Sequence, residues 1–325
     1  MRRLLKLILL LLIGLLLACV ISFFSDTSQP GQWTFHNKSK IAWSKFFWTN
    51  ETLDGKYFEK TAMFIPARIP GLPYNFTFQF DLGSGVTMIY ENTARKVFAK
   101  YPALTDKIKR LRNFLQFWNK QKIIQDFTLN FGEITVKNEN CFVKINYGDT
   151  TSVNDLNDNM QLHIGTIGAD MFQNKVLIID YPNQQFAICD SVPQNYNAKF
   201  VDIELEKSGR VILPMKLKGK DYRITFDNGS SIFPLITAES NISKYSTGPD
   251  IDSISISSWG EKHIVTGKII KDSFELAGQR FSNVKVYANH TGLGLDNATD
   301  GMAGNALFWN NTIIIDYKNK KFGVK

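Results

Sequence analysis

The hydrophobic pattern along this chain is mostly that of β-strands. Residues 75–80 alternate apolar and polar side chains, and residues 222–226 do the same, which is the period-2 pattern of a strand with one buried face. Residues 177–179 and 313–315 are continuous apolar runs, each followed by Asp-Tyr-X-Asn. These runs predict buried strands that end in turns.

Turn residues precede both alternating segments. Residues 70–73 (Pro-Gly-Leu-Pro) and 218–220 (Lys-Gly-Lys) are turn sequences, so we expect each following strand to lie in a hairpin. Helices are expected in two places, over residues 91–100 and near residues 170–174. The predicted fold class is therefore mostly β.

The sequence contains an internal duplication. Residues 168–188 and 304–324 are identical at nine of 21 positions with a constant offset of 136. Two further pairs of blocks keep the same order at an offset of 146: 123–126 with 269–272, and 80–84 with 226–230. A period above one hundred residues indicates a duplicated domain rather than a solenoid. The predicted segments are a leader (1–24), an extension or linker (25–55), a first lobe (56–192) and a second lobe (193–325), joined near residues 189–199.

The N-terminus has the pattern of a membrane-targeting segment. Residues 1–6 are basic, and residues 7–24 are almost wholly apolar, so we exclude this stretch from the fold. Residues 16–19 (Leu-Leu-Ala-Cys) resemble a bacterial lipobox, which would leave Cys19 lipidated. The 18-residue apolar run could instead span a bilayer as an uncleaved anchor, and cleavage with release is a third fate. All three place residues 25–325 outside the cytosol, in the periplasm or at the cell surface.

Composition narrows the function classes. With 325 residues, 44% of them apolar and 21% charged, the chain is globular and long enough for two cores. The net charge of +8 is spread along the sequence, which argues against nucleic acid as a partner. Beyond the leader only Cys141 and Cys189 remain, either as one disulfide or as two buried free thiols. No metal-ligand spacing links the four histidines, and no cofactor is expected: His36, His163, His263 and His290.

Each half of the duplication carries one carboxylate in the same short frame. Asp81 and Asp227 each follow an apolar strand and precede X-Gly-Ser, where the Gly permits a tight loop and the Ser could bond the carboxylate. Two such loops meeting across a pseudo-twofold axis would let the carboxyls share a proton. One could then deprotonate a water while the other polarises a carbonyl, which is metal-free hydrolysis of a peptide bond.

These features resemble the two-lobed pepsin-like aspartic proteases and their single-lobed retroviral relatives. Residues 80–84 and 226–230 occupy the place of that family's Asp-Thr/Ser-Gly loops, and residues 166–168 and 302–304 resemble the apolar-apolar-Gly segments that pack behind them. The resemblance covers roughly residues 56–325. It implies two homologous β lobes related by a pseudo-twofold axis, with an active-site cleft between them, in a divergent, bacterial, monomeric endopeptidase that needs no cofactor and cleaves peptides or proteins.

The resemblance also assigns roles to individual residues. Asp81 and Asp227 would be catalytic, supported by Gly83, Ser84, Asn228, Gly229 and Ser230. Leu82 departs from the family pattern because it has no hydroxyl to bond across to the opposite loop, so Asn228 could brace the pair only from its own side. Trp118 is the aromatic residue nearest the family's flap position, although a core or hairpin role suits it as well.

Two other interpretations of these residues remain open. Asp81 and Asp227 could be turn aspartates that only cap strand ends, which is how we interpret the duplicated Asp180 and Asp316. Alternatively, the chain could be a non-catalytic, pepsin-shaped module that binds a peptide or protein partner between its lobes.

Overall fold

The computed structural model describes residues 31–37, 39–110, 121–149, 161–291 and 298–325. The leader with Cys19, and Trp118, lie outside the described residues. Across the described ranges, no helix has both the length and the apolar character needed to cross a membrane.

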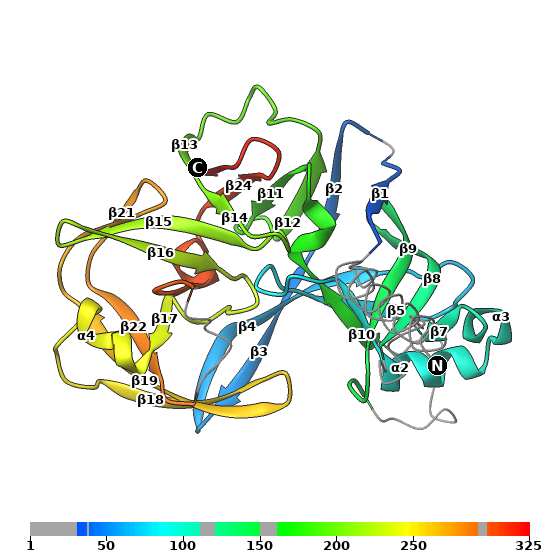
Figure 1. Cartoon of the computed structure of the whole chain (residues 1–325), viewed down its shortest axis with the longest axis horizontal. Helices are drawn as coiled ribbons and strands as arrows, with labels where there is room; N and C mark the ends of the chain where they lie inside the picture. Colours follow the sequence, from blue (N-terminus) through cyan, green and yellow to red (C-terminus); the bar gives the residue numbers. More distant parts are fainter. Residues whose placement is uncertain (1–30, 38, 111–120, 150–160, 292–297) are drawn as a thin grey trace, which may run out of the picture.

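The fold is mostly β, as the sequence patterns predict (Figure 1). The first large sheet has nine strands among the described residues: β3 (Phe47–Leu53), β4 (Lys56–Ala67), β5 (Asn75–Phe80), β10 (Gln161–Ile167), β6 (Met88–Tyr90), β9 (Ile134–Lys144), β8 (Lys122–Phe131), β7 (Ile108–Arg110) and, paired to β9, β1 (Trp33–Phe35). The second has ten: β18 (Asp252–Ser258), β19 (Glu261–Ile270), β22 (Val284–Asn289), β17 (Leu235–Ala238), β23 (Gly301–Ala303), β16 (Lys220–Phe226), β15 (Val211–Leu217), β20 (Phe274–Leu276), β21 (Gln279–Phe281) and, paired to β15, β14 (Glu204–Leu205).

The two large sheets repeat one strand order. The first runs β4-β5-β10-β6-β9-β8-β7, and the second runs β15-β16-β23-β17-β22-β19-β18. Strand directions repeat as well, because β5/β10 and β6/β9 are parallel, like β16/β23 and β17/β22. The hairpins expected before the two Asp loops are present as β4–β5 and β15–β16. The duplication in the sequence thus corresponds to a duplicated sheet.

A third sheet joins the two halves. Its six strands, among the described residues, run in the order β13 (Lys199–Asp202), β25 (Lys321–Val324), β24 (Thr312–Asp316), β11 (Val176–Asp180), β12 (Gln185–Cys189) and β2 (Ile41–Lys45). At its centre β11 pairs antiparallel with β24, and Ile178 lies opposite Ile314. The sequence offset of 136 makes these two residues equivalent. Each half therefore contributes the same strand to the centre of this sheet.

The turns after β11 and β24 are alike. Asp180 accepts a hydrogen bond from the Asn183 backbone N–H at 3.2 Å, and Asp316 accepts one from the Asn319 N–H at 2.9 Å. These aspartates have the structural role that their position in a turn predicts.

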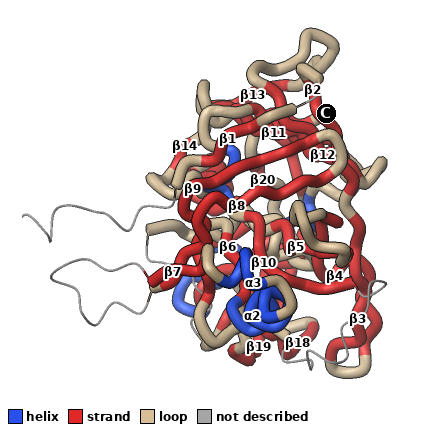
Figure 2. Tube along the Cα trace, turned by 90° about the vertical axis from the view of Figure 1, so that its right-hand side faces the viewer, coloured by secondary structure: helices blue, strands red, loops and turns tan. Residues whose placement is uncertain are grey.

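Helices are few and short. The expected helix is α2 (Glu91–Ala99), which packs on the sheet through Ala94, Val97 and Phe98 at helical spacing. It lies beside α3 (Pro102–Thr105) (Figure 2). The helix expected near residues 170–174 is only a 3-10 turn, η2 (Ala169–Phe172). Three further short elements are described: η3 (Glu239–Asn241), α4 (Ile242–Tyr245) and η4 (Asn305–Leu307).

A buried aromatic cluster lies behind each Asp loop. Phe80 contacts Phe172 and Phe186, with ring centroids 5.6 and 5.3 Å apart. The equivalent cluster repeats this packing, with centroid distances of 5.8 and 5.6 Å from Phe226 to its two neighbours: Phe308 and Phe322. All six rings are fully buried. Because such rings bury large areas in fixed geometry, they fix the strand end from which each Asp loop starts.

Two hairpins reach across between the halves (Figure 1). At the tip of β3–β4, Asp54 accepts a hydrogen bond from the Ser255 N–H of β18 at 2.6 Å. Leu53 and Phe58 of the same hairpin pack against an apolar cluster of the second half. In the other direction, Trp259 at the tip of β18–β19 contacts Tyr147, with ring centroids 5.7 Å apart.

The two cysteines are free and buried, so the disulfide alternative is wrong. Cys141 lies in β9 and Cys189 in β12, which belong to different sheets. The thiols instead face backbone carbonyl oxygens of Phe142 and Val176. Burial raises the pKa of both thiols, that of Cys189 to about 11, which keeps them protonated and unreactive.

Candidate active site

The two Asp loops start at equivalent places in the two large sheets. The Asp81 N–H donates to the Ile167 carbonyl oxygen of β10 at 3.0 Å, and the Asp227 N–H donates to that of Ala303 in β23 at 2.9 Å. Each loop thus begins where a parallel strand pair ends. Each then closes on itself, because the N–H of the Ser three residues later donates to the Asp carbonyl at 3.2 Å.

The loops bring the two carboxyls together. The Gly83 N–H donates to Asp227 Oδ1 at 3.1 Å. A Cβ added at Gly83 would overlap the Asp227 carboxyl, and one added at Gly229 would lie 2.6 Å from Asp81 Cγ. Neither glycine has a left-handed backbone, so the tight loop expected from the sequence does not by itself require glycine at these positions. Glycine is needed here because the opposite carboxyl occupies the space of a side chain.

The environment of the pair favours one shared proton. Asp81 is 7% exposed, and burial together with the Asp227 charge raises the pKa of Asp81 well above its usual range. Burial also raises the pKa of Asp227, while a hydrogen bond with the Asp81 carboxyl and the backbone N–H groups of Gly229 and Gly83 oppose that rise. Asp227 Oδ1 accepts the Gly229 N–H at 2.7 Å. Because the hydrogen bond between the two carboxyls raises the pKa of Asp81 and lowers that of Asp227, we place the proton on Asp81.

The two serines differ from the sequence expectation. Ser84 contacts Asp81 through its backbone N–H, which donates to Oδ1 at 2.9 Å. Its hydroxyl donates to the Val86 carbonyl at 2.8 Å instead. The Ser230 hydroxyl is buried and has no hydrogen-bond partner among the described residues. Neither serine hydroxyl therefore orients a carboxyl, because that of Ser84 bonds to Val86 and that of Ser230 has no partner among the described residues.

Asn228 braces the loops from one side. Its Oδ1 accepts the Leu82 N–H at 2.5 Å, whereas the Leu82 side chain, fully buried, has no polar group to return a bond. The Asn228 carbonyl accepts a bond from Asn305 Nδ2 at 2.6 Å, and Asn305 Oδ1 accepts one from the Tyr181 hydroxyl at 2.5 Å. A buried polar chain thus runs from the central sheet to the Asp81 loop.

A buried acid supports the Asp81 loop from behind. Asp170 accepts hydrogen bonds from the Thr87 N–H at 2.6 Å, the Thr87 hydroxyl at 2.7 Å and Trp33 Nε1 at 3.0 Å. The Thr87 hydroxyl in turn accepts the Gly168 N–H at 2.9 Å. Burial raises the pKa of Asp170 to about 6. The sequence patterns did not single out Asp170 or Asn305 as site residues, although each lies within two residues of a repeated Gly, Gly168 or Gly304.

The flap position that the resemblance to aspartic proteases implies falls between β7 and β8. The structure describes both strands of this hairpin, with Arg110 opposite Lys122. Trp118 falls between them, outside the described residues, so its assignment to a flap stays a prediction.

No protein-family model matches this sequence, and a search of curated proteins gives no significant match.

The shared proton has a consequence for stability. We expect Asp81→Asn to make the protein more stable than the wild type at neutral pH, and equally stable at pH 3. An acid whose pKa is higher in the folded than in the unfolded state binds more protons when folded, so wild-type stability falls as pH rises between those two pKa values. Asn does not titrate. Urea midpoints of both proteins at pH 3 and pH 7 measure this, and an Asn variant less stable at pH 7 would contradict a raised pKa.

Proposed function

We propose that this chain is an aspartic endopeptidase that hydrolyses peptide bonds with a water activated by Asp81 and Asp227. The observation that carries the proposal is the reciprocal contact of the loops, in which the Gly of each loop lies against the carboxyl of the other. If Asp81 and Asp227 only capped strand ends, nothing would require the two loops to make this reciprocal contact.

The repeated architecture supports a pseudo-twofold relation between two lobes. Equivalent strands recur in the same order in both large sheets, and Ile178 pairs with its own duplicate, Ile314. A twofold axis through such a pairing would also relate the two Asp loops. A substrate would then bind in a cleft between the lobes, as the resemblance to pepsin-like proteases implies.

The charge distribution suggests a division of roles. Asp227, which accepts the backbone donors, would act as the base and take a proton from the attacking water. Asp81 would give its proton to the oxygen of the scissile carbonyl. Asp227 then gives the proton it took from water to the amide nitrogen, while one hydroxyl of the tetrahedral gem-diol returns a proton to Asp81. The C–N bond breaks, the amine leaves, and the pair again holds one proton. No step needs a metal or a thiolate.

The experiment is a mixed peptide library incubated with the full chain in detergent between about pH 3 and pH 8, the range over which a raised carboxyl pair changes charge. Cleavage should persist with chelators and thiol reagents, and a statine-type transition-state mimic should inhibit it. Peptide binding without cleavage at any pH would instead favour the non-catalytic module. The predicted leader would place either activity outside the cytosol, anchored to the membrane.

Leu82→Thr tests the one-sided brace. The new hydroxyl can donate to the Asn228 loop, which adds a side-chain hydrogen bond between the loops from the Asp81 side. We expect turnover to rise about threefold to tenfold, the effect of a hydrogen bond worth about 1 kcal/mol in the transition state, with the KM little changed. Leu82→Val is the matched control because Val has the shape of Thr without the hydroxyl. Equal turnover in the Thr and Val variants would mean that bracing does not limit the reaction.

A further inference from the structure

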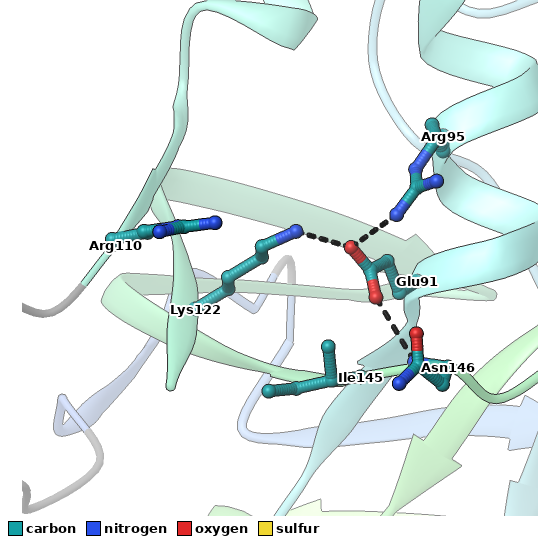
Figure 3. A pocket seen from close by; sticks show the side chains of 6 residues that line it. All are labelled: Glu91, Arg95, Arg110, Lys122, Ile145 and Asn146. Atoms are coloured by element: carbon teal, nitrogen blue, oxygen red, sulfur yellow. Dashed lines mark hydrogen bonds and ion pairs between the residues drawn. The ribbon is translucent and has the colours of Figure 1, made fainter. Parts of the chain in front are cut away.

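A basic cavity lies apart from the two carboxyls, at the base of the β7–β8 hairpin (Figure 3). Its volume is about 300 Å³. The lining comes from three places in the first half: α2, the two hairpin strands and the segment after β9. The lining residues are Glu91, Arg95, Arg110, Lys122, Ile145 and Asn146.

The one carboxylate in this cavity is already fully paired. Glu91 has a side chain that is 4% exposed, and its Oε1 accepts hydrogen bonds from Arg95, at 2.6 Å, and from Lys122. Its Oε2 accepts the Asn146 N–H at 2.9 Å. These donors hold the pKa of Glu91 at about 2, so it stays ionised. Glu91 therefore holds two cations in place and neutralises only part of their charge.

The cavity consequently has an excess of positive charge. Three cationic side chains line it against one carboxylate, and within the described ranges no carboxylate pairs with Arg110. In Figure 3 the Arg110 guanidinium points toward the Lys122 ammonium. Cations that converge on one space repel each other, and an anion between them would relieve that repulsion. Arginine forks suit the oxygens of phosphate and carboxylate groups in particular.

We propose that this cavity binds a compact oxyanion, a phosphate or carboxylate group held by Arg95, Arg110 and Lys122. Two sources share that chemistry: a free anion, or an acidic side chain of a bound peptide. The second source gains support from position. Glu91 follows Tyr90 and Asn146 precedes Tyr147, and the ring centroids of these two tyrosines lie 4.7 Å apart. Tyr147 also contacts Trp259 of the other half, so the cavity adjoins the contact between the halves. That source alone rests on the proposed peptidase function.

The first arm of the test titrates inorganic phosphate into the full chain at constant ionic strength, with chloride as the reference anion. We expect saturable binding by calorimetry, weakened about tenfold or more in Arg110→Gln, because one charge-assisted hydrogen bond is lost. Arg110→Lys should retain more affinity than Arg110→Gln. Arg280→Gln is the matched control, since Arg280 is exposed on β21 and its loss removes the same charge. Circular dichroism checks that each variant is folded.

The second arm uses two peptides that differ only by Glu or Gln, with the Asp81→Asn chain so that binding is measured without cleavage. If the chain binds the Glu peptide more tightly and Arg110→Gln abolishes this difference, the cavity binds an acidic side chain. Phosphate binding with no such preference assigns it to a free anion. The proposal is overturned if neither ligand binds saturably, or if Arg280→Gln weakens binding as much as Arg110→Gln does. Because both arms measure binding, their failure leaves hydrolysis by the two carboxyls as a separate question.

Discussion

Replacing Asp81 or Asp227 with Asn is expected to lower peptide hydrolysis by about a hundredfold to ten-thousandfold, which is the range for loss of a general acid or base. Asn keeps the shape of the side chain and can still accept the Gly83 and Gly229 N–H groups at position 227. It can neither take a proton from water nor give one to the carbonyl. The loss should therefore fall on kcat, while peptide binding stays near that of the wild type.

The double variant sharpens this test. The effects of replacing two groups that act on one water are not additive. The double variant, Asp81→Asn with Asp227→Asn, should therefore lose little more activity than either single variant. Asp221→Asn serves as the control, because Asp221 is exposed on β16, the strand that leads to Asp227. Hydrolysis that persists in either site variant, at a rate above a mock preparation, would remove the pair as the cause of cleavage.

Loss of the hydrogen bond from the Leu82 N–H to Asn228 is expected to have the largest effect on stability. Asn228→Leu leaves the Leu82 N–H buried without an acceptor, which costs about 1–3 kcal/mol in the free energy of unfolding. Turnover should fall too, because the Leu82 N–H bond positions the adjacent Gly83 N–H on Asp227. Urea unfolding gives the first quantity, and the peptide assay gives the second.

Asn228→Thr is the matched variant for this position. Thr keeps an acceptor oxygen near the Leu82 N–H and fits a buried site of this size, so we expect it to recover most of the lost stability. If the Leu variant is as stable as the wild type, the short contact between Asn228 and Leu82 contributes nothing to folding. If the Thr and Leu variants lose equal free energy of unfolding, the loss comes from altered packing and not from the missing hydrogen bond.

Local patterns predicted the elements of this fold well. The alternation over residues 75–80, the apolar run in β11 and the helical spacing of α2 all depend on neighbours in the sequence. The duplication then predicted which two loops to compare, because it singles out Asp81 and Asp227 from the other acids. The 3-10 turn η2 was expected to be a helix, but Asp170 there is held by Thr87 and Trp33, far away in the sequence.

The details of the site depend on such distant contacts and could not be predicted. The Ser84 hydroxyl turns to Val86 because the Asp81 carboxyl already has a backbone donor. Asn305 reaches the Asn228 carbonyl over 77 residues, and Glu91 meets Lys122 over 31. A single sequence contains no periodicity that reports contacts at those separations. The cavity beside Glu91 was missed for the same reason.

The two crossing hairpins couple the folding of the duplicated halves. Leu53 and Phe58, from the first half, complete an apolar cluster whose other members belong to the second, and Trp259 of the second half packs on Tyr147 of the first. The central sheet is shared in the same way, since β11 and β24 pair along their whole length. Neither half therefore contains all of the apolar contacts that stabilise it. Duplication has produced two similar sheets but one cooperative unit, in which unfolding of either half exposes the core of the other.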